Sequence, residues 1–149
     1  MSNSAVNCVL LADRHHGLTE GMRGLLETAF DAVVMVADET SLFESTERLQ
    51  PTLAVVDLSL SRGEGLQWLQ RLRARCPAMK LILISVHDQP SVCRSAMDAG
   101  ADGFVLKRAL GIELLPAVDA VIGGKRFISH ALAGLPASIA SADDSQSST

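Results

Sequence analysis

The stretch TLAVVD, residues 52–57, places four consecutive apolar residues directly before a single acidic one. Apolar and polar residues do not alternate in it, so a strand formed by this stretch has no face suited to solvent. Central strands of parallel sheets have this character because helices cover both of their faces. The stretch therefore predicts a buried parallel strand that ends at the carboxylate of Asp57.

Four further apolar runs of the same kind lie along the chain, separated by segments in which apolar residues recur at helical spacing. They are NCVLLA at 7–12, AVVMVA at 32–37, KLILIS at 80–85 and GFVL at 103–106. Five strand–helix units in succession predict an α/β fold with right-handed crossovers. The expected architecture is a doubly wound, five-stranded parallel sheet of the flavodoxin-like (βα)5 type, with strand order 2-1-3-4-5 and five flanking helices.

Some helix boundaries and faces also have sequence signals. The segment SLFE at 41–44 has the residues of a capping box, which predicts Ser41 as an N-cap. Pro90 suits the first position of the fourth helix, and Gly100 suits its end. The apolar residues that mark the fifth helix are Ile112, Leu115, Val118 and Ile122.

Composition excludes several classes of protein. The chain has 149 residues, of which 13 are basic and 17 acidic, and only 3% are aromatic. This balance argues against direct binding of nucleic acid, which needs a basic face and benefits from stacking rings. The cysteines Cys8, Cys76 and Cys93 are odd in number and lack paired spacing, which is typical of reduced thiols. With no visible signal peptide and no apolar run of the ~18 residues that cross a bilayer, we expect a cytoplasmic protein without a membrane partner.

Polar residues follow the expected strands at their carboxyl ends, where ligands bind in an open parallel sheet. They are Asp13 with Arg14, Asp57, Ser85 and Lys107. A carboxylate such as Asp57 can attack phosphorus and form an aspartyl phosphate. Phosphoryl transfer needs positive charge, which Lys107 and a divalent cation on paired carboxylates can supply, while Ser85 offers a hydrogen bond. Each residue alone also suits a turn or a solvated loop, and their common position at one sheet edge favours a site.

Five stretches resemble one family in order, spacing and residue type. They are VLLADRHHGLTEGMRGLL at 9–26, LAVVDLSLSRGEGLQWLQRLR at 53–73, ILISV at 82–86, AMDAGADGFVLKR at 96–108 and AVIGGKRFIS at 120–129. Together they resemble the receiver domain of two-component response regulators, in particular those of the nitrate-response and nitrogen-fixation type. The resemblance covers about residues 6–130.

The resemblance implies a role for each residue at the predicted sheet edge. Asp57 corresponds to the phospho-acceptor, Ser85 to the switch hydroxyl and Lys107 to the lysine that binds the phosphoryl group. Phe104 corresponds to the switch aromatic, whose ring moves inward on activation. Asp13 corresponds to the first member of an acidic pair.

The implied function is a phosphorylation-dependent signalling switch rather than an enzyme. The chain is expected to accept a phosphoryl group from a sensor histidine kinase and to control transcription through an output domain absent from it. The face of the fourth helix, fifth strand and fifth helix is expected to bind that output domain or a second copy of the chain. The predicted receiver spans residues 1–131, and residues 132–149 are expected to be a disordered tail or the start of an interdomain linker.

One departure from the family concerns the cation site. Arg14 stands where the family has its second acidic residue, a direct Mg²⁺ ligand, so Mg²⁺ is expected to bind weakly to Asp13 and Asp57. A guanidinium favours the charged form of a nearby carboxyl, so Arg14 is expected to reach Asp57 when the metal is absent. His15 and His16 are adjacent and diverge on a turn, and no further His or Cys stands at ligand spacing, so no metal site is expected there.

Other functions compete with the signalling switch. Arg14 also suits a degenerate receiver that acts as a phosphorylation-independent protein-interaction module. A phosphatase of the haloacid-dehalogenase type uses a similar Asp nucleophile, but it needs a second acid two residues later, where Ser59 stands. Flavodoxin shares the fold, but ADRHHG at 12–17 is poorly suited to cradle a phosphate.

Overall fold

The structure is a computed structural model that describes residues 7–61 and 65–133. In this part of the chain there are six strands: β1 (Cys8–Ala12), β2 (Ala32–Val36), β3 (Leu53–Asp57), β4 (Lys80–Ser85), β5 (Gly103–Leu106) and β6 (Phe127–Ile128). The described α-helices are α1 (His16–Leu26), α2 (Glu39–Leu49), α3 (Gln67–Arg75), α4 (Pro90–Asp98), α5 (Leu110–Ile122) and α6 (His130–Ala133). Two short 3-10 helices, η1 (Leu58–Leu60) and η2 (Lys107–Ala109), directly follow β3 and β5.

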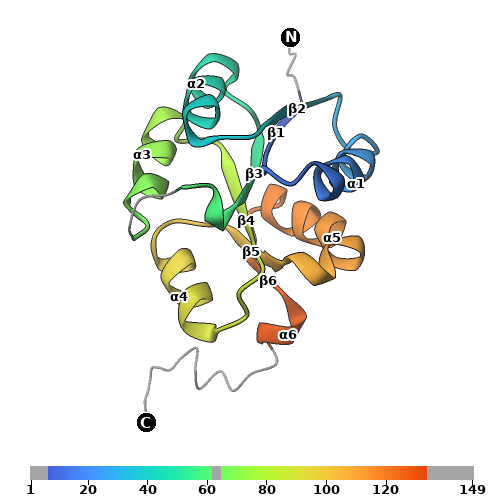
Figure 1. Ribbon diagram of the computed structural model, residues 1–149, viewed down its shortest axis with the longest axis vertical. Helices are drawn as coiled ribbons and strands as arrows, with labels where there is room; N and C mark the ends of the chain where they lie inside the picture. The colour runs from blue at the N-terminus through green and yellow to red at the C-terminus, as the bar shows by residue number, and fades with distance from the viewer. Residues whose placement is uncertain (1–6, 62–64, 134–149) are drawn as a thin grey trace.

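The strands form one parallel sheet in the order β2-β1-β3-β4-β5-β6 (Figure 1). The predicted α/β class and the order of the first five strands are confirmed. The predicted counts of five strands and five helices are wrong, because the described residues contain a sixth strand and a sixth α-helix. The sixth strand pairs Phe127 with Gly103 and Ile128 with Phe104 at the outer side of β5. It was missed because a two-residue strand is too short to show a pattern in the sequence.

Helices cover both faces of the sheet, as predicted from strands in which apolar and polar residues do not alternate. The helices α2, α3 and α4 lie on one face, and α1 and α5 lie on the other (Figure 1). Successive strand residues therefore enter different cores: Leu10 packs in the cluster beneath α2–α4, and Leu11 packs in the cluster beneath α1 and α5. Burying one such side chain contributes roughly 1.5–3 kcal/mol. Apolar residues at every strand position follow from this two-sided burial.

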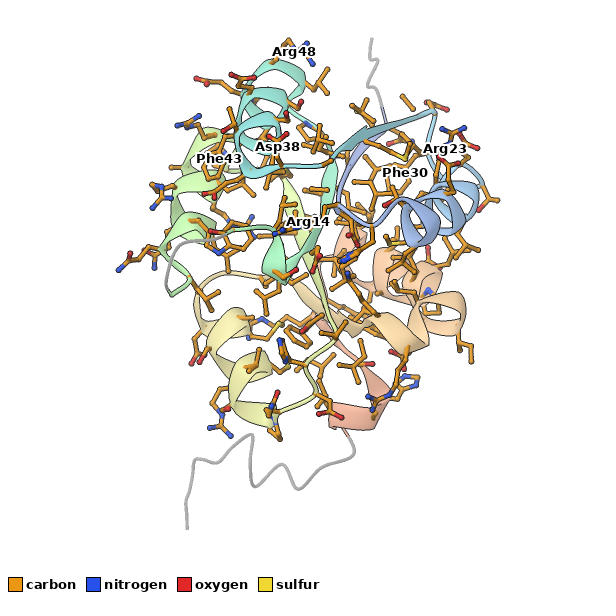
Figure 2. The ribbon with its side chains drawn as sticks, viewed as in Figure 1. Arg14, Arg23, Phe30, Asp38, Phe43 and Arg48 are labelled. Carbon is orange, nitrogen blue, oxygen red and sulfur yellow. The ribbon has the colours of Figure 1, made fainter. Side chains whose placement is uncertain are left out.

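The starts of two helices test the predicted boundary signals. Pro90 is the first residue of α4, and Gly100 follows its end with a φ of +118°, as predicted. The predicted cap at Ser41 is wrong, because α2 begins at Glu39 and its N-cap is Asp38, whose side chain accepts a hydrogen bond from the Ser41 N–H at 2.7 Å. That hydrogen bond lowers the pKa of the Asp38 carboxyl from its usual value. Asp38 (labelled in Figure 2) has the extended backbone of an N-cap and directly precedes α2, two residues after the end of β2.

The buried face of α5 differs from the face predicted from Ile112, Leu115, Val118 and Ile122. Ile112 is 81% exposed and Ile122 is 43% exposed. The buried positions of this helix are Leu110, Glu113, Leu114, Ala117, Val118 and Val121. The helix is therefore rotated from the predicted phase, and its core-facing side includes a charged residue.

Glu113 is held by the segment that follows β6. The Ser129 hydroxyl donates to Glu113 Oε1, and the backbone N–H of His130 donates to Glu113 Oε2 at 3.0 Å. Ser129 is itself wholly buried, and its N–H donates to the Phe104 carbonyl at 2.8 Å. We call Glu113, Ser129 and His130 the Glu113 cluster. It fastens the start of α6 to both α5 and β5.

The predicted tail lies mostly outside the described residues. Its first two residues, 132 and 133, end α6, and Leu132 is buried. Residues 134–149 fall outside the described part of the chain, so the boundary at residue 131 stays a prediction. Among the residues that the structure describes, none of the helices has the length and apolar character needed to cross a bilayer.

Candidate functional site

The sheet order brings four predicted residues to one edge. Asp57 is the last residue of β3 and Ser85 the last of β4, while Asp13 follows β1 and Lys107 follows β5. These four strands are neighbours in the sheet, and all are parallel, so their carboxyl ends meet. We call Asp13, His15, Asp57 and Lys107 the carboxylate pocket, because the structure brings these four side chains into contact.

Lys107 joins the two carboxylates. Its Nζ lies 3.1 Å from Asp13 Oδ2 and 3.1 Å from Asp57 Oδ2. The Lys107 side chain is only 10% exposed, and both aspartates are buried beneath it. One ammonium group therefore serves two carboxylates that would otherwise repel each other.

Asp57 is ionised and held in place by its own loop. Its Oδ1 accepts the backbone N–H of Ser59 at 3.1 Å, and its Oδ2 accepts the Ser59 hydroxyl at 2.9 Å. Burial raises the pKa of this carboxyl, but the hydrogen bond from the Ser59 N–H and the Lys107 ammonium outweigh it, so the pKa lies below its usual value. Asp57 is therefore present as the carboxylate, which is its nucleophilic form.

Asp13 is less completely satisfied. Its side chain is wholly buried, and its Oδ1 accepts the backbone N–H of His15 and lies 2.9 Å from His15 Nδ1. Its Oδ2 has no hydrogen-bond partner among the described residues, although it lies 3.1 Å from Lys107 Nζ. That contact is an ion pair whose geometry falls short of a hydrogen bond. Asp13 Oδ2 thus remains free to accept another ligand.

Arg14 makes a different contact from the predicted one. It donates from Nη2 to the Ser59 carbonyl at 2.7 Å, and within the described residues it forms no ion pair with Asp57. Figure 2 shows the Arg14 side chain near the segment that follows β3. The chain bends at Arg14 directly after β1, so that Asp13 is buried whereas Arg14 is exposed. Arg14 therefore acts on the loop that holds Asp57 and leaves the carboxylate itself to Lys107.

Among the described residues, Ser85 is hydrogen-bonded to His87 and not to Asp57, and Phe104 lies in the core. Ser85 is buried, and its Oγ accepts the backbone N–H of His87 at 2.8 Å. Phe104 is 0% exposed and packs in the core beneath α2–α4. The ring of Phe104 thus already lies inward in this structure.

The donor set of the pocket fits a divalent cation. Two buried carboxylates face one another across a positive group, and one of their oxygens lacks a donor. Carboxylate oxygens are the ligands that hard divalent ions prefer. Asp13 and Asp57 are the residues that would hold such an ion.

Sequence reasoning missed two contributors to the site. His15 was placed outside any metal site, yet it offers a ligand atom within 4.8 Å of those of Asp13 and Asp57. Ser59 was considered only as a missing acid, yet it gives Asp57 two hydrogen bonds. A hydroxyl residue two positions after an acidic strand end is a signal for such a turn, and it was available in the sequence.

Several known proteins are similar to this chain in sequence. Residues 9–119 match the family model for the response regulator receiver domain. The chain is 33% identical over 136 residues to the transcriptional activator protein ExaE of Pseudomonas putida, covering 84% of this chain and 59% of the relative. It is 31% identical over 134 residues to the nitrate/nitrite response regulator protein NarL of Escherichia coli K12, covering 89% and 62%. The chain thus spans about three fifths of the length of these curated relatives.

A solved structure gives the same result in three dimensions. The crystal structure of a two-component response regulator of the LuxR family from Aurantimonas sp. SI85-9A1 matches with a TM-score of 0.77 at 27% identity. The match covers 87% of this chain and 94% of that one. The chain belongs to the family of response regulator receiver domains.

Proposed function

We propose that this chain is a signalling switch that accepts a phosphoryl group on Asp57 from a histidine kinase. Response regulator receiver domains are signalling proteins. The observation that carries the assignment to Asp57 is its environment: a buried, ionised carboxylate at a strand end, 3.1 Å from Lys107 Nζ. Asp13 is also buried and lies equally close to Lys107 Nζ, but His15 engages its Oδ1, whereas Asp57 is oriented by two hydrogen bonds from Ser59 in its own loop.

The transfer step uses this environment directly. One oxygen of Asp57 attacks the phosphorus of a phosphohistidine and forms an aspartyl phosphate. The P–N bond breaks, and its electron pair returns to the imidazole, which takes up a proton. Lys107 pairs with the transferred phosphoryl oxygens, where positive charge is needed most. The Ser85 hydroxyl reaches the same group after it leaves the backbone of His87.

A divalent cation belongs to this proposal. Receiver domains generally bind Mg²⁺ at an acidic pocket, and here Asp13 and Asp57 form such a pocket. The cation supplies positive charge at the reacting phosphoryl group. Because Arg14 replaces one acidic residue, we expect a weak site for Mg²⁺ in this chain.

The partners follow from the family and the exposed surface. Response regulators of the LuxR family work with histidine kinases and form dimers. The partner-binding face is assigned to α4, β5 and α5, where Ile112 is 81% exposed. Phe104 lies beneath this face and would transmit a change from Lys107 rather than contact the partner. Residues 1–131 form the receiver in this proposal, and residues 132–149 begin a linker to an output domain that controls transcription.

The test is a phosphorylation assay by intact mass. The chain is incubated with acetyl phosphate and a divalent cation, beside Asp57→Asn and a control, Asp98→Asn, which alters an exposed aspartate on α4. We expect one added phosphoryl group on the wild type and on Asp98→Asn, and none on Asp57→Asn. An added group that persists in Asp57→Asn would place the acceptor elsewhere. No added group on the wild type with any cation would favour the phosphorylation-independent interaction module.

A further inference from the structure

The carboxylate pocket contains a third metal-ligand atom, the Nδ1 of His15. Three potential ligand atoms, one from each of Asp13, His15 and Asp57, lie within 4.8 Å of one another. His15 Nδ1 is 2.9 Å from Asp13 Oδ1 and 3.8 Å from Asp57 Oδ2. Neighbouring ligands of an ion with bonds of about 2.1 Å lie roughly 3.0 Å apart in an octahedron and roughly 3.4 Å apart in a tetrahedron. A small movement of the imidazole, whose side chain is 59% exposed, brings all three groups to one ion.

A second observation points to a cation at the same place. The Asp13 side chain is wholly buried, and its Oδ2 accepts no hydrogen bond from the described residues. The Lys107 ammonium lies 3.1 Å from this oxygen, 3.1 Å from Asp57 Oδ2 and 3.3 Å from His15 Nδ1. Lys107 Nζ thus marks a point from which a cation contacts all three ligand residues. A metal ion at that point would satisfy the oxygen that the ammonium leaves without a donor.

The donor set selects the class of ion. Mg²⁺ prefers oxygen ligands, whereas imidazole binds divalent first-row transition ions well. The pocket also lacks a carboxylate from position 14, because Arg14 stands there and turns to the Ser59 carbonyl. The loss of this negative charge weakens the binding of Mg²⁺, which depends on carboxylate charge. It weakens the binding of a transition ion less, because the imidazole adds a nitrogen ligand.

We propose that Asp13, His15 and Asp57 form a site for a divalent first-row transition ion, and that His15 makes such an ion preferred over Mg²⁺. This inference rests on the proposed function in one respect, since it assigns the cation that accompanies phosphorylation of Asp57. The Lys107 ammonium swings away from the carboxylates when the ion binds, which its flexible four-carbon stem permits. The displaced ammonium is then available to a phosphoryl group.

The first test measures metal binding by calorimetric titration without any phosphodonor. Mn²⁺, Zn²⁺ and Mg²⁺ are titrated separately into the wild type, His15→Ala and the control His87→Ala, which removes an exposed imidazole from the neighbouring loop. We expect the wild type and His87→Ala to bind Mn²⁺ or Zn²⁺ at least about tenfold more tightly than Mg²⁺. His15→Ala should lose most of that preference. An equal affinity for all three ions in the wild type, or an unchanged preference in His15→Ala, would overturn the proposal.

The second test detects the ligand itself. Pulsed electron paramagnetic resonance of the Mn²⁺-loaded wild type should show coupling to an imidazole ¹⁴N nucleus, and the coupling should vanish in His15→Ala. His15→Asp, which supplies a carboxylate in place of the imidazole, should shift the preference towards Mg²⁺. Coupling that survives in His15→Ala would assign the nitrogen ligand to another residue and refute the role of His15.

The two proposals fail in different ways. Phosphorylation of Asp57 supported equally by Mg²⁺ and Mn²⁺, with no ¹⁴N coupling, would remove the metal inference and leave the proposed function intact. A chain that shows ¹⁴N coupling to bound Mn²⁺ but never gains a phosphoryl group would refute the proposed function and leave the metal inference intact.

Discussion

The carboxylate pocket and the Glu113 cluster both bury acidic side chains, but they satisfy them differently. Glu113 is one carboxylate that receives a hydroxyl and a backbone N–H, one for each oxygen. Asp13 and Asp57 are two carboxylates that share one ammonium, and Asp13 Oδ2 has no hydrogen bond from the described residues. A satisfied buried carboxylate fastens elements together, whereas an incompletely satisfied pair is prepared for a ligand. The contrast separates an acid with a structural role from acids with a functional one.

Replacing a buried carboxylate by its isosteric amide should change the free energy of unfolding in opposite directions in the two regions. The larger change is expected for Glu113→Gln. The amide NH₂ cannot accept a hydrogen bond, so either the Ser129 hydroxyl or the His130 N–H loses its acceptor. A buried donor left without a partner costs about 1–3 kcal/mol. Urea denaturation should show a loss of about 2 kcal/mol in the free energy of unfolding. An unchanged midpoint would show that Glu113 does not fasten α6.

Asp13→Asn should instead stabilise the fold. The substitution removes one of two facing charges and the charged oxygen that lacks a donor, while the remaining oxygen still accepts the His15 N–H. We expect a gain of about 1 kcal/mol in the same urea experiment, together with weaker binding of divalent ions. A loss of stability as large as that of Glu113→Gln would mean that both regions are structural in the same sense.

The pH dependence of stability sharpens the description of Asp57. Its pKa is lower in the folded chain than its usual value, because the Ser59 N–H and Lys107 outweigh burial. The stabilisation from its ionised form is therefore present above about pH 4, the range of the unfolded carboxyl, and is lost as the pH falls through the folded pKa. Urea denaturation from pH 5 down to pH 2 should show a shallower decline in Asp57→Asn than in the wild type. Identical slopes would contradict the ionised, paired state of Asp57.

The smallest expected effect concerns Arg14. Its contact with the Ser59 carbonyl is at the surface, so Arg14→Ala should change the unfolding free energy by no more than about 0.5 kcal/mol. The loop that orients Asp57 should nevertheless loosen, with faster hydrogen exchange at the Ser59 amide. Arg48→Ala, which alters an exposed arginine on α2 (Figure 2), is the matched control and should leave that amide unchanged. Equal exchange in both variants would show that the Arg14 contact does not hold the loop.

The fold was predictable because the same physical constraint acts on every residue of a strand. Two-sided burial requires apolar residues throughout, so the runs around Leu10 and Val55 were visible without any alignment. The meeting of Asp13, Asp57 and Lys107 also followed from topology, because parallel strands end at a common edge.

Other missed features depend on local geometry that residue types do not encode. The outward turn of Arg14 is decided by the turn after β1, and the choice of Asp38 over Ser41 as a cap is decided by where β2 ends. Glu113 was missed because a charged residue was not counted among the core positions of α5. Its partner Ser129 lies beyond β6, a strand too short to recognise.

The short β6 strand has a consequence for how the molecule meets its neighbours. A strand at the border of a sheet exposes a row of unpaired backbone groups that invites another chain to add a strand. Here β6 covers only Gly103 and Phe104, and the Ser129 N–H then donates to the Phe104 carbonyl before the chain turns into α6. The edge of β5 is thus covered by the two residues of β6, and the chain then enters α6. On this side, the sheet is protected against open-ended growth by strand addition.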